Sequence, residues 1–264
     1  MRVHFAAWWG RLTMDSPGLA PTTSLLGIDF SNITEEAAVR RVLARPVAAR
    51  FGYVVAPNAD HIDRLMRIPR LQAVYRRAML CLLSSQMVAT AAGLFGLEHP
   101  GVVTGARLTT ALLPHLAGMR VAVVGMKDKD FARVRACYPL VEFVHHEPPM
   151  ALLDNDEAFG EAVAFVCRAR AAFTFFAVDS PVQELLAFSV AMRPEAVGIG
   201  LCVGAALEQA VGVQETAPRW MSEHGLEWLH LRGLEPMRRV GRYMLADPRV
   251  LVALGVAAIR QKIH

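Results

Sequence analysis

The sequence predicts an α/β fold, in which a Rossmann-like parallel sheet carries helices on both faces and is followed by a C-terminal helical extension. Short runs of almost wholly apolar residues recur along the chain, and such strands are typical of a parallel sheet that is buried on both faces. The stretches between them have helical periodicity. Within residues 157–168, for example, Phe159, Val163 and Val166 fall on one helix face. Strands that alternate with amphipathic helices indicate a sheet covered on its two sides.

Six runs have the length and composition of buried strands: residues 53–56, 80–83, 121–125, 141–144, 173–178 and 197–203. The helical patterns occupy residues 35–43, 60–77, 107–116, 128–137 and 157–168. Near the C-terminus, residues 236–244 and 248–259 each open with a proline, as helices often do. We therefore divide the chain into a loose N-terminal segment (1–24), an α/β domain (25–217) and a helical extension (218–264).

The composition excludes several classes of protein. The chain has 264 residues, of which 54% are hydrophobic and 20% charged, whereas disordered chains are poor in apolar residues. Its 4 cysteines lie far apart, which excludes a disulfide scaffold and leaves no ligand spacing for zinc. This usage suits a reducing compartment. His145 and His146 are neighbours on an extended segment and point to opposite faces, so we expect no metal site.

The excess positive charge lies in the C-terminal extension. Residues 219–264 contain 8 Lys/Arg and 4 Asp/Glu, whereas the rest of the chain contains 20 of each. The extension lacks the interleaved aromatic residues of a single-strand binder, so we expect no nucleic-acid partner. A membrane surface is the other anionic partner, since each Lys or Arg near anionic lipid contributes ~1 kcal/mol.

No segment is expected to span a bilayer. The longest candidate, residues 250–259, is about half of the ~20 residues that a spanning helix needs. We predict a cytoplasmic protein, peripheral on the inner face of the membrane. Residues 250–259 have an apolar side, and three arginines precede them; we favour an interfacial amphipathic helix. The alternative is a helix packed on the partner in a homo-oligomer.

Candidate site residues follow the predicted strands, because ligands of open α/β sheets bind at the carboxyl ends of the strands. These segments contain Asn58, Ser84, Gly125, Asp179 and Gly204. The dinucleotide fingerprint G-x-G-x-x-G is absent after every one of these strands, and so is a P-loop. The sequence therefore argues against a nicotinamide enzyme, and we expect no cofactor.

A series of short segments carries a family resemblance. They are Ala56-Pro-Asn-Ala-Asp-His61, Val103-Thr-Gly105, Ser180-Pro-Val-Gln-Glu184, Gly204-Ala205, Ala217-Pro-Arg-Trp-Met221, Gly225-Leu-Glu-Trp-Leu229 and Glu235-Pro236 with the arginines and Tyr243 after it. Together they span about residues 27–246 and resemble the WecG/TagA/CpsF family of bacterial glycosyltransferases. His145-His146-Glu-Pro-Pro-Met150 is further similar to the branch that adds a hexose in xanthan-type exopolysaccharide assembly.

This resemblance implies transfer of a sugar from a UDP-sugar donor to a polyprenyl-diphosphate-linked glycan, with inversion and without an obligatory metal. It also implies an aspartate after the strand at 80–83, which takes the proton of the acceptor hydroxyl. The substrate-binding positions are Asn58, Thr104, Gly105, Gln183, Gly204 and Glu208, and the lipid-diphosphate positions are Arg238, Arg239 and Arg242. We interpret Thr104-Gly105 as a tight loop whose backbone amides approach a phosphate.

The positions that carry the chemistry depart from the family pattern. Ser84 stands at the aspartate position, and a serine hydroxyl is no base at neutral pH without its own activator. The other replaced positions are Ala56, Val102, Val182, Leu207-Glu208 and Glu215-Thr216. We hypothesise that Asp179 or Glu208 supplies the missing base. The favoured alternative is that Asp179 caps the following helix jointly with Ser180.

The surviving candidates also have structural interpretations. Gln183 either binds sugar or completes a capping box with Ser180. Asn58 either serves the site, which we favour, or tolerates an unusual backbone at a strand-to-helix turn. Asp60 is expected to be the N-cap of the next helix, and His61 a packed or exposed surface residue.

Two functions from different classes follow. The first is an active hexosyltransferase of exopolysaccharide or cell-surface polysaccharide biosynthesis. The alternative is a catalytically degenerate relative that keeps the fold and acts as a binding or partner protein.

Overall fold

A six-stranded parallel sheet forms the centre of the molecule. The computed structural model describes residues 20–212 and 237–263, with the side chains of the last helix described from Pro248 to Gln261. The strands are β3 (Gly52–Val55), β4 (Leu80–Cys81), β5 (Arg120–Gly125), β6 (Glu142–His146), β7 (Phe173–Ala177) and β8 (Ile199–Cys202). They pair in the order β4-β3-β8-β7-β5-β6, and each pair is parallel. All six predicted strands, and the predicted α/β class, are confirmed.

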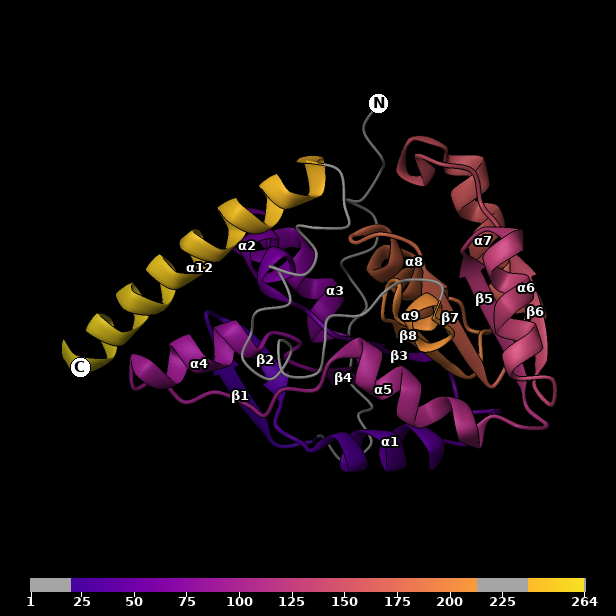
Figure 1. Ribbon diagram of the computed structural model, residues 1–264, viewed down its shortest axis with the longest axis horizontal. Coiled ribbons are helices and arrows are strands. Elements are labelled where there is room, and N and C mark those ends of the chain that lie inside the picture. Colours follow the sequence, from indigo (N-terminus) through magenta and orange to yellow (C-terminus); the bar gives the residue numbers. More distant parts are fainter. Residues whose placement is uncertain (1–19, 213–236, 264) are drawn as a thin grey trace.

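Helices cover both faces of the sheet (Figure 1). One face carries α2 (Ala59–Arg67), α3 (Gln72–Arg76), α4 (Gln86–Leu94), α7 (Asp156–Ala169), α8 (Val182–Ala191) and α12 (Met237–Ile263). The opposite face carries α1 (Glu35–Leu43), α5 (Gly105–Leu112), α6 (Asp128–Cys137) and α9 (Ala206–Ala210). Neighbouring strand residues serve different faces, since Phe175 packs under the second group and Phe176 under the first. The helices predicted at 35–43 and 128–137 have their predicted bounds.

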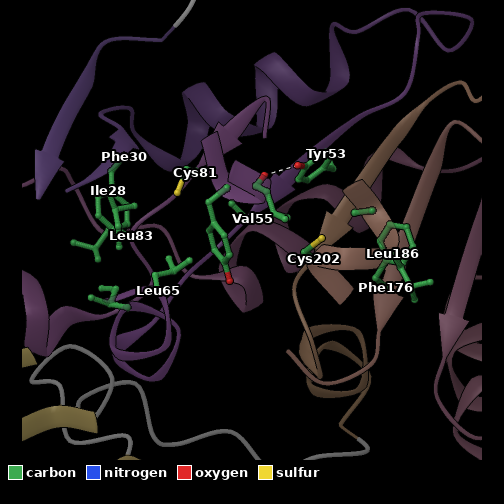
Figure 2. Close-up of a cluster of buried hydrophobic side chains, with 14 of the residues drawn as sticks. Ile28, Phe30, Tyr53, Val55, Leu65, Cys81, Leu83, Phe176, Leu186 and Cys202 are labelled. Carbon is green, nitrogen blue, oxygen red and sulfur yellow. Dashed lines mark hydrogen bonds between the residues drawn. The ribbon is translucent and has the colours of Figure 1, made fainter. Parts of the chain in front are cut away.

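The core under the first group of helices draws on strands and helices alike. Figure 2 shows part of it, with side chains from β2 (Ile28–Ser31), β3, β4, β7, β8, α2 and α8. Cys81 and Cys202 are buried in this layer, and all four cysteines are free. Burial raises the pKa of both buried thiols. Cys137 is exposed instead.

The helix predicted over residues 60–77 is interrupted. It consists of α2, a 3₁₀ turn at Pro69–Leu71 and α3, with Ile68 in a non-helical conformation between them. Pro69 explains the break, because a proline has no N–H and pushes the residue before it out of the helical region. The helix predicted over 107–116 likewise ends in a 3₁₀ turn, Leu113–His115, that contains a proline.

An antiparallel hairpin precedes the sheet and was not predicted. It joins β1 (Thr22–Leu25) to β2 (Ile28–Ser31), so residues 22–24, expected to be loose, form a strand. Both turn residues, Leu26 and Gly27, have positive φ, as the favoured two-residue turn requires. The Cys81 N–H donates a hydrogen bond to Ser31 Oγ (3.2 Å), which ties the hairpin to β4.

In the described part of the C-terminal extension, a single helix of 27 residues, α12, takes the place of the two short helices predicted. Pro248 lies inside it, where the second helix was expected to begin. Helix α12 lies against α2 and α4 (Figure 1), and buries Val250, Leu254 and Ala258. Within the described ranges, no helix is both long and apolar enough to cross a membrane.

Candidate active site

The carboxyl ends of the six strands lie along one edge of the sheet. Between β3 and β8 the chain path changes direction, because α2 follows β3 on one face and α9 follows β8 on the other. Open α/β sheets bind their ligands at such positions. Asn58 follows β3 and Gly204 follows β8, so two of the predicted site residues flank this change of direction.

Asn58 is held by the first turn of α2. It is the N-cap of this helix: Asn58 Oδ1 accepts a hydrogen bond from the His61 N–H (3.2 Å), and the Asn58 N–H donates to His61 Nδ1 (3.0 Å). These two bonds form a capping box. The prediction that Asp60 is the N-cap is wrong; its carboxylate pairs with Arg64 (2.6 Å). In the described part of the chain, the Asn58 amide NH₂ has no hydrogen-bond partner, so it is available to a ligand.

His61 is a partly buried, neutral imidazole, with its side chain 13% exposed. Burial lowers its pKa, and Glu184 opposes the shift without reversing it. A backbone N–H can only donate, so Nδ1 carries no proton and the proton of the neutral ring is on Nε2. Nε2 lies 3.8 Å from Glu184 Oε1. Both ring nitrogens thus face protein atoms, and His61 is not placed to take a proton from a substrate.

Gln183 and Glu184 are buried in the first turn of α8. Gln183 Nε2 donates to Glu184 Oε1 (2.9 Å), and Gln183 Oε1 accepts from the Gly204 N–H (2.8 Å). Gly204 has a φ of +57°, a region that suits glycine. The capping-box alternative for Gln183 is wrong, because α8 begins after Pro181 and has no side-chain cap. Gln183 instead joins the segments that follow β7 and β8.

Ser84 lies just beyond β4, half-buried. Its N–H donates to the Pro57 carbonyl (2.9 Å), which brings the segments after β3 and β4 together. Ser85, not Ser84, caps α4. In the described part of the chain, no side chain contacts the Ser84 hydroxyl closely enough to activate it.

Asp179 is exposed at the end of β7. Its carbonyl oxygen accepts a hydrogen bond from the Val182 N–H (2.9 Å). The expected joint cap of α8 by Asp179 and Ser180 is wrong: neither side chain caps this helix. Ser180 Oγ instead accepts from Arg64 (2.8 Å). The Asp179 carboxylate is left facing solvent at the carboxyl edge of the sheet.

Thr104 and Gly105 begin a helix, where a tight loop was expected. Thr104 is the N-cap of α5 and accepts a hydrogen bond from the Arg107 N–H (3.2 Å). Gly105 allows α5 to approach the end of β8, because a Cβ added there would lie 3.1 Å from Val203 Cβ. The glycine therefore serves close packing.

A second polar cluster lies after β5 and β6. His145 Nε2 lies 2.8 Å from the Gly125 carbonyl oxygen, and Nδ1 lies 3.1 Å from Asp128. The ring stacks on Phe131, with centroids 4.1 Å apart. His145 thus holds the segment that follows β5.

His146 stacks on Phe165 of α7, on the other side of the sheet, so the prediction of opposite faces for these two histidines is confirmed. In the ranges that the structure covers, no three His, Cys, Asp or Glu side chains are grouped to hold a metal ion.

Comparison with known families agrees with this arrangement. The sequence model of the glycosyl transferase WecG/TagA/CpsF family matches residues 23–264. The chain belongs to the WecG/TagA/CpsF family. This is a family of glycosyltransferases of cell-surface polysaccharide synthesis, which in general use a sugar-nucleotide donor and a lipid-linked acceptor. A search of curated proteins finds no significant match.

The family match includes the C-terminal extension of this WecG/TagA/CpsF family member. Arg238, Arg239 and Arg242 lie in the first turns of α12, but their side chains fall outside the described residues, as do the motifs at 217–221 and 225–229. Glu208 lies half-buried on α9, the helix that follows β8 in the chain.

The sequence analysis of this family member did not predict that two residues, His61 and Glu184, contact the candidate site. His61 was treated as a surface residue, and Glu184 was given no role. One signal was available: His61 is the third residue after Asn58, the spacing of a capping box. Glu184 has no local signal, because its contact with His61 joins residues more than 100 positions apart in the sequence.

Proposed function

We propose that this protein binds a UDP-sugar at the carboxyl ends of β3, β4 and β8. It transfers the hexose to a polyprenyl-diphosphate-linked saccharide in exopolysaccharide assembly, as in the xanthan-type branch. The observation that carries the proposal is the Asn58 amide. It is fixed by the capping box of α2, and its NH₂ group can donate to an oxygen of the donor.

The transfer needs a base for the acceptor hydroxyl. As the hydroxyl oxygen bonds to the anomeric carbon, the bond from that carbon to UDP breaks and the proton passes to a carboxylate. Ser84 stands where the family has an aspartate, and His61 has Nδ1 hydrogen-bonded to the Asn58 N–H and Nε2 directed at Glu184, 3.8 Å away. We propose that Asp179, with its exposed carboxylate at the same edge of the sheet, takes this proton.

A second candidate function is binding without turnover. It is supported by the Ser84 hydroxyl, which has no activating partner among the described residues. In this role the protein would hold a sugar nucleotide or a lipid-linked glycan, or a partner transferase, and the chemistry would belong to another protein.

We further propose that the extension, residues 218–264, holds the protein on the inner face of the membrane. Helix α12 contains six Lys/Arg and one Asp, and its outer face exposes Leu251, Val252, Val256 and Ile259. Apolar residues beside cationic ones are typical of an interfacial helix on anionic lipid. A lipid-linked acceptor would then diffuse past the same surface.

The decisive experiment is calorimetric titration of the purified protein with UDP and a panel of UDP-hexoses. We expect one UDP-hexose to bind more tightly than UDP. Asn58→Asp keeps the cap but removes the donor, and should weaken binding by about tenfold or more. Asn155 caps α7 in the same manner after β6, so Asn155→Asp is the matched control and should bind as the wild type does.

Turnover separates the two functions. Transfer of labelled hexose to a lipid-linked saccharide, lost in Asp179→Asn, supports the enzyme. Binding without transfer, with transfer gained in Ser84→Asp, supports the second function. A folded protein that binds no UDP-hexose contradicts the proposed donor site.

A further inference from the structure

A chain of polar contacts, buried at its centre, joins three segments at the carboxyl edge of the sheet. It runs from Asn58 after β3 to His61, then to Glu184 and Gln183 on α8, and ends at Gly204 after β8. The contacts are Asn58 N to His61 Nδ1 (3.0 Å), His61 Nε2 to Glu184 Oε1 (3.8 Å), Gln183 Nε2 to Glu184 Oε1 (2.9 Å) and Gly204 N to Gln183 Oε1 (2.8 Å). The change of direction in the chain path lies between its two ends.

Glu184 is the centre of this chain. It is only 2% exposed, and a single oxygen, Oε1, faces both Gln183 Nε2 and His61 Nε2. Its other oxygen, Oε2, is buried without a hydrogen-bond partner in the part of the chain that the structure describes. No Lys or Arg of the described residues pairs with this carboxylate: Arg64 of α2 pairs with Asp60 and donates a hydrogen bond to Ser180.

A buried carboxylate with one unsatisfied oxygen destabilises a fold more than an apolar side chain of similar size would. Such groups are retained where they orient something else. Here the two groups that Glu184 orients are the His61 imidazole, which fixes the Asn58 backbone, and the Gln183 amide, which fixes the Gly204 N–H.

We infer that Glu184 is a positioning residue of the donor site, and that it acts through His61 and Gln183 to set the Asn58 amide and the Gly204 backbone in one geometry; the inference rests on the proposed function. Glu184 contacts no ligand in this role. Its Oε1 accepts one hydrogen bond, from Gln183 Nε2 (2.9 Å), and lies 3.8 Å from His61 Nε2, close enough for electrostatic attraction, so the segments after β3 and β8 keep their spacing. A displacement of about 1 Å at such a position is enough to lower activity by a large factor.

The test compares Glu184→Leu with Glu184→Gln. Leucine removes the acceptor, whereas glutamine keeps an oxygen that can accept the Gln183 N–H. We expect UDP-hexose binding, by calorimetry, to weaken about tenfold in Glu184→Leu and to stay within about threefold of the wild type in Glu184→Gln. Wild-type affinity in Glu184→Leu, or an equal loss in both variants, would overturn the inference.

Asp63 provides the matched control. It is also a carboxylate on this side of the sheet and 2% exposed, but it pairs with Arg67 and takes no part in the chain. Asp63→Leu should lower stability without changing donor affinity. If Asp63→Leu loses as much affinity as Glu184→Leu, the loss is a general effect of destabilising the fold, and the positioning role of Glu184 is refuted.

A second readout needs no ligand. In ¹⁵N spectra of the free wild-type protein, His61 should have an unprotonated Nδ1, and the Gly204 amide signal should shift in Glu184→Leu but not in Asp63→Leu. If the wild type binds no UDP-hexose, the proposed function fails, while these signals still decide whether Glu184 positions Gly204. Asn58 and Gly204 amide signals that are unchanged in Glu184→Leu would refute the positioning role of Glu184. Should Glu184→Leu not fold, Glu184→Met carries the same test, because methionine also removes the carboxylate acceptor.

Discussion

Arg249 of α12 reaches a buried carboxylate on α2. Its guanidinium lies 3.7 Å from Asp63 Oδ2, and the same oxygen lies 2.8 Å from Arg67. The Asp63 side chain is 4% exposed, whereas both arginines are about half exposed. Val250 and Leu254, which follow Arg249 on α12, are buried. Apolar contacts and an ion pair therefore both hold α12 against α2.

Removal of both arginines should therefore be much more damaging than removal of one. Arg249→Ala leaves Asp63 paired with Arg67, and we expect it to lower the free energy of unfolding by less than about 1 kcal/mol. Arg67→Ala with Arg249→Ala leaves a buried charge unpaired, which should cost about 2–3 kcal/mol, discounted for the exposure of both arginines. Urea unfolding measures both. Two single variants that sum to the double would contradict this coupling.

Gly105 is required by packing. In Gly105→Ala, the new Cβ would lie 3.1 Å from Val203 Cβ, so α5 or β8 must shift, and we expect a loss of about 1–2 kcal/mol in unfolding free energy. Val203→Ala in the same chain makes room and should recover part of the loss. Thermal or urea unfolding of the two single variants and the double variant forms the test; strict additivity would contradict it.

Gly160 should respond in the opposite direction. It lies inside α7, exposed, and a Cβ there would meet no atom within 4 Å. Gly160→Ala should raise the free energy of unfolding by about 0.5–1 kcal/mol, because alanine loses less backbone entropy in a helix. A destabilised Gly160→Ala variant would refute the packing described for this helix face.

The stability of the protein should depend on pH through His61. Burial lowers the pKa of His61 from its usual 6.5, so below pH 6.5 the unfolded chain binds a proton that the folded protein does not yet bind. This contribution is fully present above pH 6.5 and is lost as the pH falls through the lower folded pKa. Urea unfolding at pH 7.5 and pH 5.5 should show a smaller decrease in His61→Gln than in the wild type. Parallel pH profiles would count against a partly buried, neutral His61.

The outer face of α12 should bind anionic membranes. Val252 is 67% exposed and Ile259 61% exposed, and replacement of both by serine should reduce co-sedimentation with anionic vesicles about tenfold, because buried apolar area is lost. Leu140, 74% exposed before β6, is the matched control, and Leu140→Ser should bind like the wild type. Binding of the wild type should also weaken as salt is raised. An unchanged double variant that has become monomeric would favour the homo-oligomer instead.

Part of the candidate site was predictable from the sequence, because four of its residues follow predicted strands. Asn58, Ser84, Asp179 and Gly204 follow strands that are almost wholly apolar, and parallel strands bring their carboxyl ends to one edge. The contacts between these segments were not predictable. Gln183 was expected either to bind sugar or to complete a capping box, and neither alternative included the contact of its amide with Gly204, 21 residues away in the chain. Helix α8 lies beside the segments after β3 and β8 only because these two strands, distant in the sequence, pair with each other.

Local patterns in the sequence determined the class of the fold, the six strands and the helices at 35–43 and 128–137, since burial on two faces and on one face leave different periodicities. The tertiary structure decided what depends on distant residues. The hairpin at 22–31 is ordered because Phe30 is buried in the core. The helix α12 continues through Pro248 where its next turns, with Val250 and Leu254, pack against the body of the protein. The chain from Asn58 to Gly204 exists because α2 and α8 cover the same face of the sheet, and no local propensity specifies that meeting.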